Sequence, residues 1–375
     1  MNIPFNKPFL TGQELEYVRQ AAEGGKLSGN GVFTQRCQQL LCQRYRFRKA
    51  LLTTSCTDAL EMAAILSQIG PGDEVVVPSF TFVSTALAFV RQGARIVFAD
   101  SSPDHPNMDL DQVESLVTPR TKAVVVMHYA GVACDMDRVM SLAQQHRFLV
   151  IEDAAQSIDA FYRDRPLGGI GHLGCFSFHE TKNIVAGEGG ALVVNDDGRF
   201  AGRPEIIWEK GTNRAAFFRG EVDKYGWVDT GSSFLPSEIT AAFLCAQLEG
   251  MDAIQAKRKL LWSRYAEELS GLERQGKIVL PRIPAYATNN AHVFHVVCRS
   301  LEERTALMAH LKSQGVSSVF HYLPLHKSPY YASRHDGRAL PNADRFADCL
   351  LRLPLYVDLT LAQVEQVCGC VRDFY

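Results

Sequence analysis

Hydrophobic residues between about residues 50 and 195 alternate between two kinds of segment. Longer stretches with helical periodicity separate several short runs that are rich in β-branched residues. Continuous apolar strands separated by helices indicate a mostly parallel sheet that is buried on both faces, and thus an α/β fold. The expected helices are 57–68, 83–92 and 136–146, and the expected strands are 74–77, 95–98, 122–127, 148–151 and 191–195.

The second half of the chain has a different pattern. Residues 236–269 predict a long helical stretch, which is followed by prolines and polar residues up to residue 290. A shorter α+β pattern comes next, with a strand near 292–298 and helices near 302–314 and from about 361. We therefore expect a large domain over 1–250, which includes an N-terminal arm, and a smaller C-terminal domain over 251–375.

Composition excludes several classes of protein. The chain has 39 basic and 41 acidic residues, so a nucleic-acid or anionic-membrane surface is not expected. No run of about 18 apolar residues predicts a membrane helix, and the first residues lack a signal-peptide core. The ten cysteines are scattered without a CxxC pair, and neither His321 nor His326 has metal-ligand spacing. We expect a cytoplasmic protein with reduced thiols and no metal.

Gly169, Gly171 and Gly174 match the spacing G-x-G-x-x-G. A dinucleotide-binding loop of this kind follows a strand and opens a helix. Here the motif follows the polar stretch 163–166 and precedes 175–178, which looks like a strand. We therefore expect a glycine-rich surface loop and not an NAD site.

Two polar clusters lie where a strand ends or a helix begins. Glu152 and Asp153 directly follow an expected strand, which is where parallel α/β folds bind ligands. Asp153 would equally fit a helix N-cap. Residues 55–60 open a helix, whose free N–H groups and the Thr57 hydroxyl would hold an anion or simply cap the helix.

Lys182 lies in the polar segment 177–183, shortly before the glycine-rich residues 187–190. A reactive amine must lose its proton, which requires burial or neighbouring cations. Glycines allow the backbone to approach a bound ring or phosphate closely. Most lysines lie on the surface, so the segment alone would also fit a solvated turn.

The order of these segments says more than any one of them. An anion cradle, an aromatic residue after the next strand, an acid after a later strand and then a lysine together match the needs of pyridoxal phosphate. At this point the chain resembles the DegT/DnrJ/EryC1/StrS sugar aminotransferase family over nearly its whole length, from 3–8 and 25–29 to 353–355. The resemblance implies the aspartate-aminotransferase fold (fold type I), with a large mixed-sheet domain and a small α+β domain.

The resemblance also assigns roles to residues. Lys182 would bind the cofactor aldehyde covalently and later carry a proton between the substrate carbon and the cofactor. Asp153 would pair with the pyridine nitrogen. The other implied cofactor contacts are Cys56, Thr57 and Ser177 at the phosphate, Phe82 on the ring and Gln156 at the ring oxygen.

Two segments depart from the family pattern. The usual Ser-Gly-Thr is replaced by residues 55–57, where Cys56 still offers its N–H. Relatives commonly carry Gly-Tyr-Asn-Tyr-Arg after the lysine, and the Asn of this motif reaches the cofactor phosphate of the neighbouring subunit. Here Ser233 stands at the Asn position, and its shorter side chain would donate directly or through water.

Four segments, 178–183, 209–214, 217–220 and 320–326, resemble the branch of the family that aminates C4 of dTDP-4-keto-6-deoxy-D-glucose. This implies that L-glutamate donates the amino group and that the product is dTDP-4-amino-4,6-dideoxygalactose, a precursor of lipopolysaccharide or O-antigen. The gluco epimer and a 3-amino sugar nucleotide are the alternatives. A homodimer with shared active sites is also implied, with sugar contacts from Lys26, Asn183, His321 and Tyr322.

Three other readings differ in class. Some relatives are dehydratases that replace the lysine with histidine, whereas Lys182 is retained here. A non-catalytic, cofactor-binding regulator would keep the site without releasing 2-oxoglutarate. An NAD oxidoreductase would use the glycine motif and bind NADH.

Overall fold

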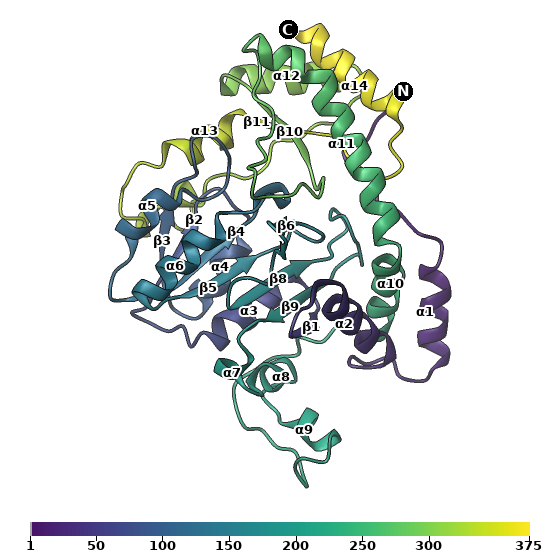
Figure 1. Ribbon diagram of the computed structural model, residues 1–375, viewed down its shortest axis with the longest axis vertical. Helices are drawn as coiled ribbons and strands as arrows, with labels where there is room; N and C mark the ends of the chain where they lie inside the picture. Colours follow the sequence, from purple (N-terminus) through teal and green to yellow (C-terminus); the bar gives the residue numbers. More distant parts are fainter. Residues whose placement is uncertain (1) are drawn as a thin grey trace.

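The computed structural model describes residues 2–375 and is built around a seven-stranded sheet in the order β1-β9-β8-β5-β4-β2-β3 (Figure 1). β9 runs antiparallel to β1 and β8, and the other neighbours pair in parallel. The expected α/β fold with a mostly parallel sheet is confirmed. The strands are β1 (Lys49–Thr53), β2 (Glu74–Pro78), β3 (Arg95–Ala99), β4 (Thr121–Met127), β5 (Leu149–Asp153), β8 (Leu173–Ser177) and β9 (Gly190–Val194).

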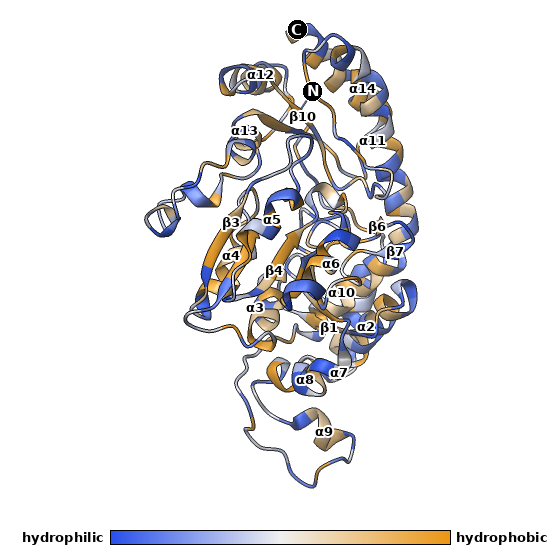
Figure 2. Ribbon diagram, turned by 60° about the vertical axis from the view of Figure 1, so that its left-hand side comes forward, coloured by the Kyte–Doolittle hydropathy of each residue, from blue (hydrophilic) through white to orange (hydrophobic). Residues whose placement is uncertain are grey.

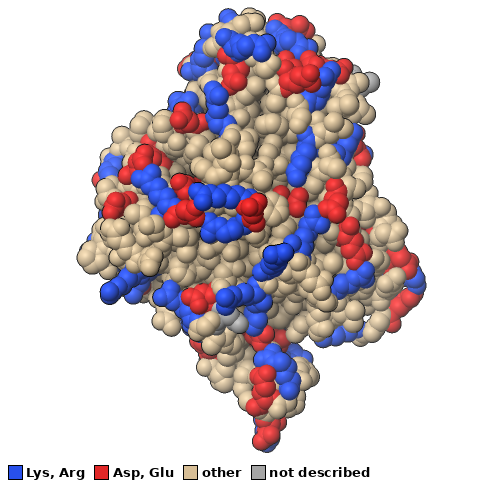
Figure 3. All heavy atoms as spheres, in the orientation of Figure 1, with Lys and Arg blue, Asp and Glu red and all other residues tan. Residues whose placement is uncertain are grey.

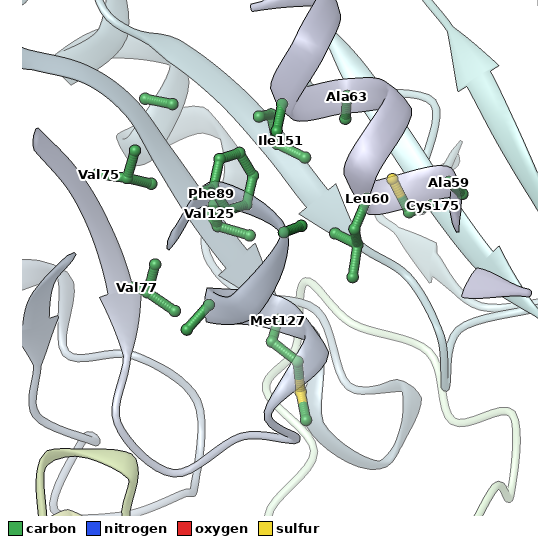
Figure 4. Close-up of a cluster of buried hydrophobic side chains, with 14 of the residues drawn as sticks. Ala59, Leu60, Ala63, Val75, Val77, Phe89, Val125, Met127, Ile151 and Cys175 are labelled. Atoms are coloured by element: carbon green, nitrogen blue, oxygen red, sulfur yellow. The ribbon is translucent and has the colours of Figure 1, made fainter. Parts of the chain in front are cut away.

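Strand side chains alternate between the two sides of the sheet, and in this sheet both sides carry apolar side chains. Helices therefore cover both faces. Val75 and Val77 of β2 pack under α3 (Cys56–Leu66) and α4 (Ser84–Arg91) (Figure 4). Val76 faces the opposite side. The helices on that side are α5 (Leu110–Leu116) and α6 (Met136–His146), with α2 (Val32–Tyr45) and α10 (Glu238–Glu249) beside β1 and β9.

The long helical stretch expected at 236–269 is two helices. α10 ends at Glu249, and α11 (Met251–Arg274) begins after Gly250, which caps both helices. A Cβ at Gly250 would lie 2.6 Å from Cγ2 of Thr11, so the glycine lets the N-terminal segment pass directly against the junction.

The C-terminal part has its own apolar core. A two-stranded antiparallel sheet packs with helices around Leu261, Leu307 and Val367. Phe346 instead packs into the core that contains α3 and α4, so the two parts share an apolar interface. The division at residue 250 stays a prediction. The elements are β10 (Phe294–Val297), α12 (Leu301–Ser313), α13 (Pro341–Cys349), β11 (Leu350–Leu353) and α14 (Leu361–Phe374).

The N-terminal segment before α1 (Glu14–Glu23) joins the two parts of the molecule. Ile3 pairs with the C-terminal part through hydrogen bonds to Gly315 and Ser317. The carbonyl oxygen of Phe9 accepts a bond of 2.7 Å from Nε2 of Gln247 on α10. Residues between these two anchors therefore cross the space where the two parts meet.

A segment after β9 projects away from the body of the molecule and carries α9 at its tip (Figures 1 and 2). It exposes large apolar side chains, among them Phe218 and Trp227, which are 69% and 85% exposed. The short elements of this region and of the loop before β8 are β6 (Phe161–Tyr162), β7 (Arg165–Pro166), α7 (Asp197–Phe200), α8 (Arg203–Trp208) and α9 (Arg214–Phe218).

Acidic and basic side chains are interspersed on the face of the molecule shown in Figure 3. No helix within residues 2–375 combines the length and the apolarity that a bilayer crossing needs. The described residues also contain no group of three or more ligands arranged to hold a metal ion.

The glycine motif was expected to form a surface loop, and this expectation is wrong. Gly168 and Gly171 are buried, and Gly174 belongs to β8. The reason is Glu152, a fully buried carboxylate that accepts N–H bonds from Gly168 and Ile170 at 2.7 Å and from Gly171 at 2.5 Å. The glycines therefore serve the packing of a buried loop, and the motif opens no helix.

His128 completes this buried cluster. Its Nδ1 accepts the N–H of Cys134 at 3.1 Å, which leaves Nε2 to donate to Glu152 at 3.0 Å. Glu152 thus receives four hydrogen bonds, which satisfy its charge away from water.

Replacing Glu152 by alanine should lower the free energy of unfolding by about 3 kcal/mol, because His128 and three backbone N–H groups lose their acceptor. Urea denaturation followed by circular dichroism measures this loss. The matched control is Glu267→Ala, an exposed helical carboxylate that pairs with Arg264 and should change stability by less than about 0.5 kcal/mol. Equal losses in both variants would contradict the anchoring role.

Candidate active site

The residues expected to bind a cofactor gather at the carboxyl ends of the parallel strands. Asp153 is the last residue of β5 and Ser177 the last residue of β8, while Cys56 follows β1. Carboxyl ends of parallel strands share one edge of a sheet, which is where open α/β folds bind ligands.

Strand register builds a cradle at this edge. Thr53 of β1, Gly190 of β9 and Ser177 of β8 lie in one row across three strands. A Cβ at Gly190 would lie 2.5 Å from the backbone nitrogen of Cys56, so only glycine lets the start of α3 sit against the row. The row therefore brings the Ser177 hydroxyl to the helix N-terminus.

The N-terminus of α3 presents an anion site. The Ser55 side chain accepts the N–H of Asp58 at 3.1 Å, which is ordinary capping. The N–H groups of Cys56 and Thr57 open the helix and have no acceptor in its ladder. The Thr57 hydroxyl is held 2.8 Å from that of Ser84. Free N–H groups, two hydroxyls and the helix dipole together suit a phosphate.

Asp153 is 4% exposed and points into the same region. Thr85 donates to its Oδ2 at 2.6 Å, and the N–H of Ala155 donates to its Oδ1 at 3.1 Å. No helix begins here, which excludes the N-cap reading. Burial raises the pKa of Asp153, against the opposing effects of these hydrogen bonds and of Lys182. A cation placed beside this carboxylate would offset its burial.

Gln156 has a fixed amide orientation. Its Oε1 accepts the N–H of Ala130 at 2.6 Å, and its Nε2 donates to the Tyr322 hydroxyl at 2.7 Å. Tyr322 comes from the C-terminal part of the chain, so this bond joins the two parts of the molecule at the pocket.

Lys182 lies in a pocket lined by residues from several segments that are far apart in the sequence. It shares the wall with Asn6, Gln156, His321 and Arg352. Burial lowers the pKa of the Lys182 amine, and the positive charge of Arg352 acts in the same direction, while Cys56 and Asp153 oppose it. A lysine held in this way loses its proton more readily than an exposed one.

His321 is kept neutral beside Lys182. Its ring stacks on that of Tyr322 with centroids 3.6 Å apart, and Nδ1 lies 2.7 Å from the Tyr129 hydroxyl. Burial lowers the pKa of His321 well below its ordinary value, and Arg352 and Lys182 lower it further. At neutral pH the ring therefore carries no charge.

The remaining expected site residues differ in how they are placed. Asn183 is 4% exposed; its amide nitrogen bonds to Gln255 and Asn290 and its oxygen to His292, so no donor is left for a sugar. Lys26 is exposed, and Nζ donates to the carbonyl of Asn30 at 2.6 Å, outside the Lys182 pocket.

Phe82 and Ser233 are exposed side chains. Phe82 is 56% exposed, and its ring centroid lies 6.3 Å from that of Tyr322. Ser233 lies at the base of the projecting segment, and the next residue, Phe234, accepts the N–H of Thr54 at 3.0 Å. The implied contacts of Phe82 and Ser233 with the cofactor stay predictions.

Sequence reasoning missed several residues of the site. Thr85, which holds Asp153, lies on α4 and has no local signal. Arg352 could have been found, because it is the one charged residue in the apolar strand 350–353. Asn6 and His292 reach the pocket only through the tertiary fold.

The residues present fit pyridoxal phosphate. The N-terminus of α3 suits its phosphate, and a Cβ at Gly190 would fill that cradle. Asp153 is a buried carboxylate without an ion-pair partner among residues 2–375, as the protonated ring nitrogen requires. Lys182 supplies a half-buried amine of lowered pKa for the aldehyde.

Comparison with known proteins agrees with this geometry. Residues 8–372 match the DegT/DnrJ/EryC1/StrS aminotransferase family. The chain belongs to this family. It is 32% identical to the spore coat polysaccharide biosynthesis protein SpsC of Bacillus subtilis (strain 168), over 99% of this chain and 96% of SpsC.

Solved structures of the family share its fold. DesV of S. venezuelae, solved in complex with a ketimine intermediate, is 31% identical and superposes with a TM-score of 0.91, covering 100% of this chain and 98% of DesV. A putative sugar aminotransferase, Spr1654 of Streptococcus pneumoniae, was solved in its PMP form and is 25% identical, with a TM-score of 0.92 and coverage of 100% and 99%. The chain is thus a pyridoxal-phosphate-dependent sugar aminotransferase and not an NAD oxidoreductase.

The lowered pKa of Lys182 should be visible as a pH dependence. The apo-protein should take up pyridoxal phosphate faster as pH rises, with a midpoint below that of a free lysine amine, because burial and Arg352 favour the neutral amine. Visible absorbance measures the rate, and Nα-acetyllysine titrated alongside gives the reference midpoint. Coincident midpoints would show that the amine is not desolvated.

Proposed function

We propose that this enzyme transfers an amino group from L-glutamate to C4 of dTDP-4-keto-6-deoxy-D-glucose, giving dTDP-4-amino-4,6-dideoxygalactose. The convergence of Lys182 and Asp153 at one edge of the sheet, where the charge of each affects the pKa of the other, carries the aminotransferase chemistry. The choice of sugar is supported by the four segments that resemble the C4-aminating branch. Among these, segment 320–326 reaches the Lys182 pocket through His321.

The polysaccharide context is supported by one relative. The curated name of SpsC places that protein in spore coat polysaccharide biosynthesis. An amino sugar nucleotide is a precursor suited to such a polymer, and we extend this role to the present chain.

Lys182 acts as the base and acid of the transfer. When bound, pyridoxal phosphate supplies an aldehyde that accepts the amino group and a ring that takes up the electron pair freed at the substrate carbon. Lys182 removes the proton from the amino-bearing carbon of the donor and returns a proton to the sugar carbon. Its pKa is lowered by burial, so the amine is available as a base near neutral pH.

Asp153 and Gln156 orient the ring. The Asp153 carboxylate, fixed by Thr85 and Ala155, would accept the ring N–H and would keep that nitrogen positively charged. Gln156 is held by Ala130 and Tyr322, which leaves one N–H for the ring oxygen. Asp153 and Gln156 would therefore hold the ring at two of its polar atoms.

The first test is a visible spectrum of the purified protein with bound cofactor. Adding L-glutamate should bleach the yellow colour and release 2-oxoglutarate, and adding the ketosugar nucleotide should restore it. NMR of the product then distinguishes an axial C4 amine, as proposed, from the equatorial gluco epimer or a 3-amino sugar. Lys182→Ala should lower turnover by at least about a thousandfold, because no other amine lies in the pocket to move the proton.

Normal turnover by Lys182→Ala would overturn the assignment of the base. Asp153→Asn keeps the shape of Asp153 but not its charge. This variant should still bind the cofactor, but its proton transfer should be far slower than that of the wild type. If L-glutamate leaves the wild-type colour unchanged, L-glutamate is not the amino donor and the proposed function fails.

We also propose that the working form is a homodimer. The projecting segment exposes Phe218, Tyr225 and Trp227 together, a set of side chains that a monomer rarely leaves in water. A second copy of this chain would cover them and would close the open side of Phe82, which is 56% exposed at the cofactor region.

Light scattering after gel filtration should give twice the chain mass for the wild type. Trp227→Ser should shift the equilibrium toward the monomer by about tenfold or more, because the most exposed aromatic of the segment loses its burial in the dimer. Leu15→Ser, a 75% exposed apolar residue on α1, is the matched control. A monomeric wild type with full activity would contradict the proposal.

A further inference from the structure

Arg352 forms no ion pair with any carboxylate among residues 2–375. It lies on β11, and its Nη2 donates to the carbonyl of Phe320 at 3.0 Å. Its Nε is buried and has no hydrogen-bond partner within residues 2–375. Its guanidinium lies 4.8 Å from the ring centroid of Phe5, and no acidic side chain of the described chain pairs with it.

The surroundings of Arg352 provide no hidden counter-charge. His295 faces it directly across β10 and β11, and burial and Arg352 hold the pKa of that ring at about 3. Tyr129 and Tyr322 stay protonated, since burial raises the pKa of each. An unpaired donor on a buried guanidinium is costly, and an incoming anion would relieve that cost.

Arg352 and Lys182 line the same small pocket, together with Gln156, His292 and His321. Neither histidine carries charge near neutral pH, because burial lowers the pKa of both. Arg352 is therefore the permanent positive charge of this pocket, and Lys182 is the group on which the transfer depends. A ligand that reacts at Lys182 and carries anionic oxygens would place them at Arg352.

We propose that Arg352 binds a carboxylate of the amino donor. This inference rests on the proposed function, in which L-glutamate is the amino donor, and names the residue that recognises this donor. Both substrates bring anionic oxygens, as carboxylates in glutamate or as the diphosphate of the sugar nucleotide. The α-carboxylate is bonded to the same carbon as the transferred amine and must stay near Lys182. The diphosphate is separated from the reacting C4 by the hexose ring, so the shared pocket favours the carboxylate.

The two half-reactions separate these sources. Arg352→Gln removes the charge at similar length and should weaken the apparent affinity for L-glutamate about tenfold to a hundredfold, when cofactor bleaching is followed at increasing glutamate. The second half-reaction, started from the aminated cofactor form and followed at increasing ketosugar nucleotide, should change by less than about threefold. Arg352→Lys, which keeps the charge but loses the planar fork, should fall between wild type and Arg352→Gln.

A binding assay without chemistry gives an independent readout. Glutarate has both carboxylates of glutamate and no amine, so it should raise the melting temperature of the wild-type holoenzyme and not that of Arg352→Gln. Arg345→Gln is the matched control. Arg345 also donates to a carbonyl, that of Pro103, and lies over an aromatic ring, but it is exposed and outside the Lys182 pocket.

Each outcome of these assays either supports or overturns the assignment of Arg352 to the donor carboxylate. Loss confined to the glutamate half-reaction, with loss of the glutarate shift, supports the assignment. Loss confined to the sugar half-reaction would place the diphosphate at Arg352 and overturn it, as would equal losses in both or no loss at all. If Arg352→Gln does not fold, Arg352→Lys carries the same comparison. A wild type that reacts with no amino donor would refute the proposed function, and the glutarate assay would still test Arg352.

Discussion

One close approach organises the active site, namely the contact between the start of α3 and Gly190. The antiparallel strand β9 lies between β1 and β8, which places Gly190 between Thr53 and Ser177. Because Gly190 lacks a side chain, the first N–H groups of α3 reach the sheet edge. The anion cradle and its position beside Ser177 both depend on this one contact.

Much of this arrangement could be predicted from the chain alone. Buried parallel strands have a strong apolar signature, and the order of Thr57, Asp153 and Lys182 indicated a cofactor before any fold was known. Their convergence follows from topology, since each lies at or after the carboxyl end of a strand. The break at Gly250 and the burial of Glu152 escaped prediction because they depend on contacts with residues far away in the sequence, such as Thr11 and Gly168.

The sugar-binding residues were the least predictable. Asn183 matched a family position, yet its amide is used by Gln255, Asn290 and His292. A sequence motif shows that a residue type is required at a position, but it does not show which hydrogen-bond partners that residue has. Arg352 shows the converse case, because its significance appears only when the burial of its surroundings leaves it without a partner.

The N-terminal segment has a mechanical consequence. Ile3 is bonded to the C-terminal part and Phe9 to α10, while Asn6, between them, donates to the carbonyl of Glu180 beside Lys182. Phe5 and Asn6 also form part of the pocket wall. The segment is hydrogen-bonded at both ends, to the C-terminal part and to α10. A rotation of the C-terminal part would therefore displace the loop that carries Lys182. A movement of the C-terminal part relative to the rest of the molecule would thus also change the shape of the pocket.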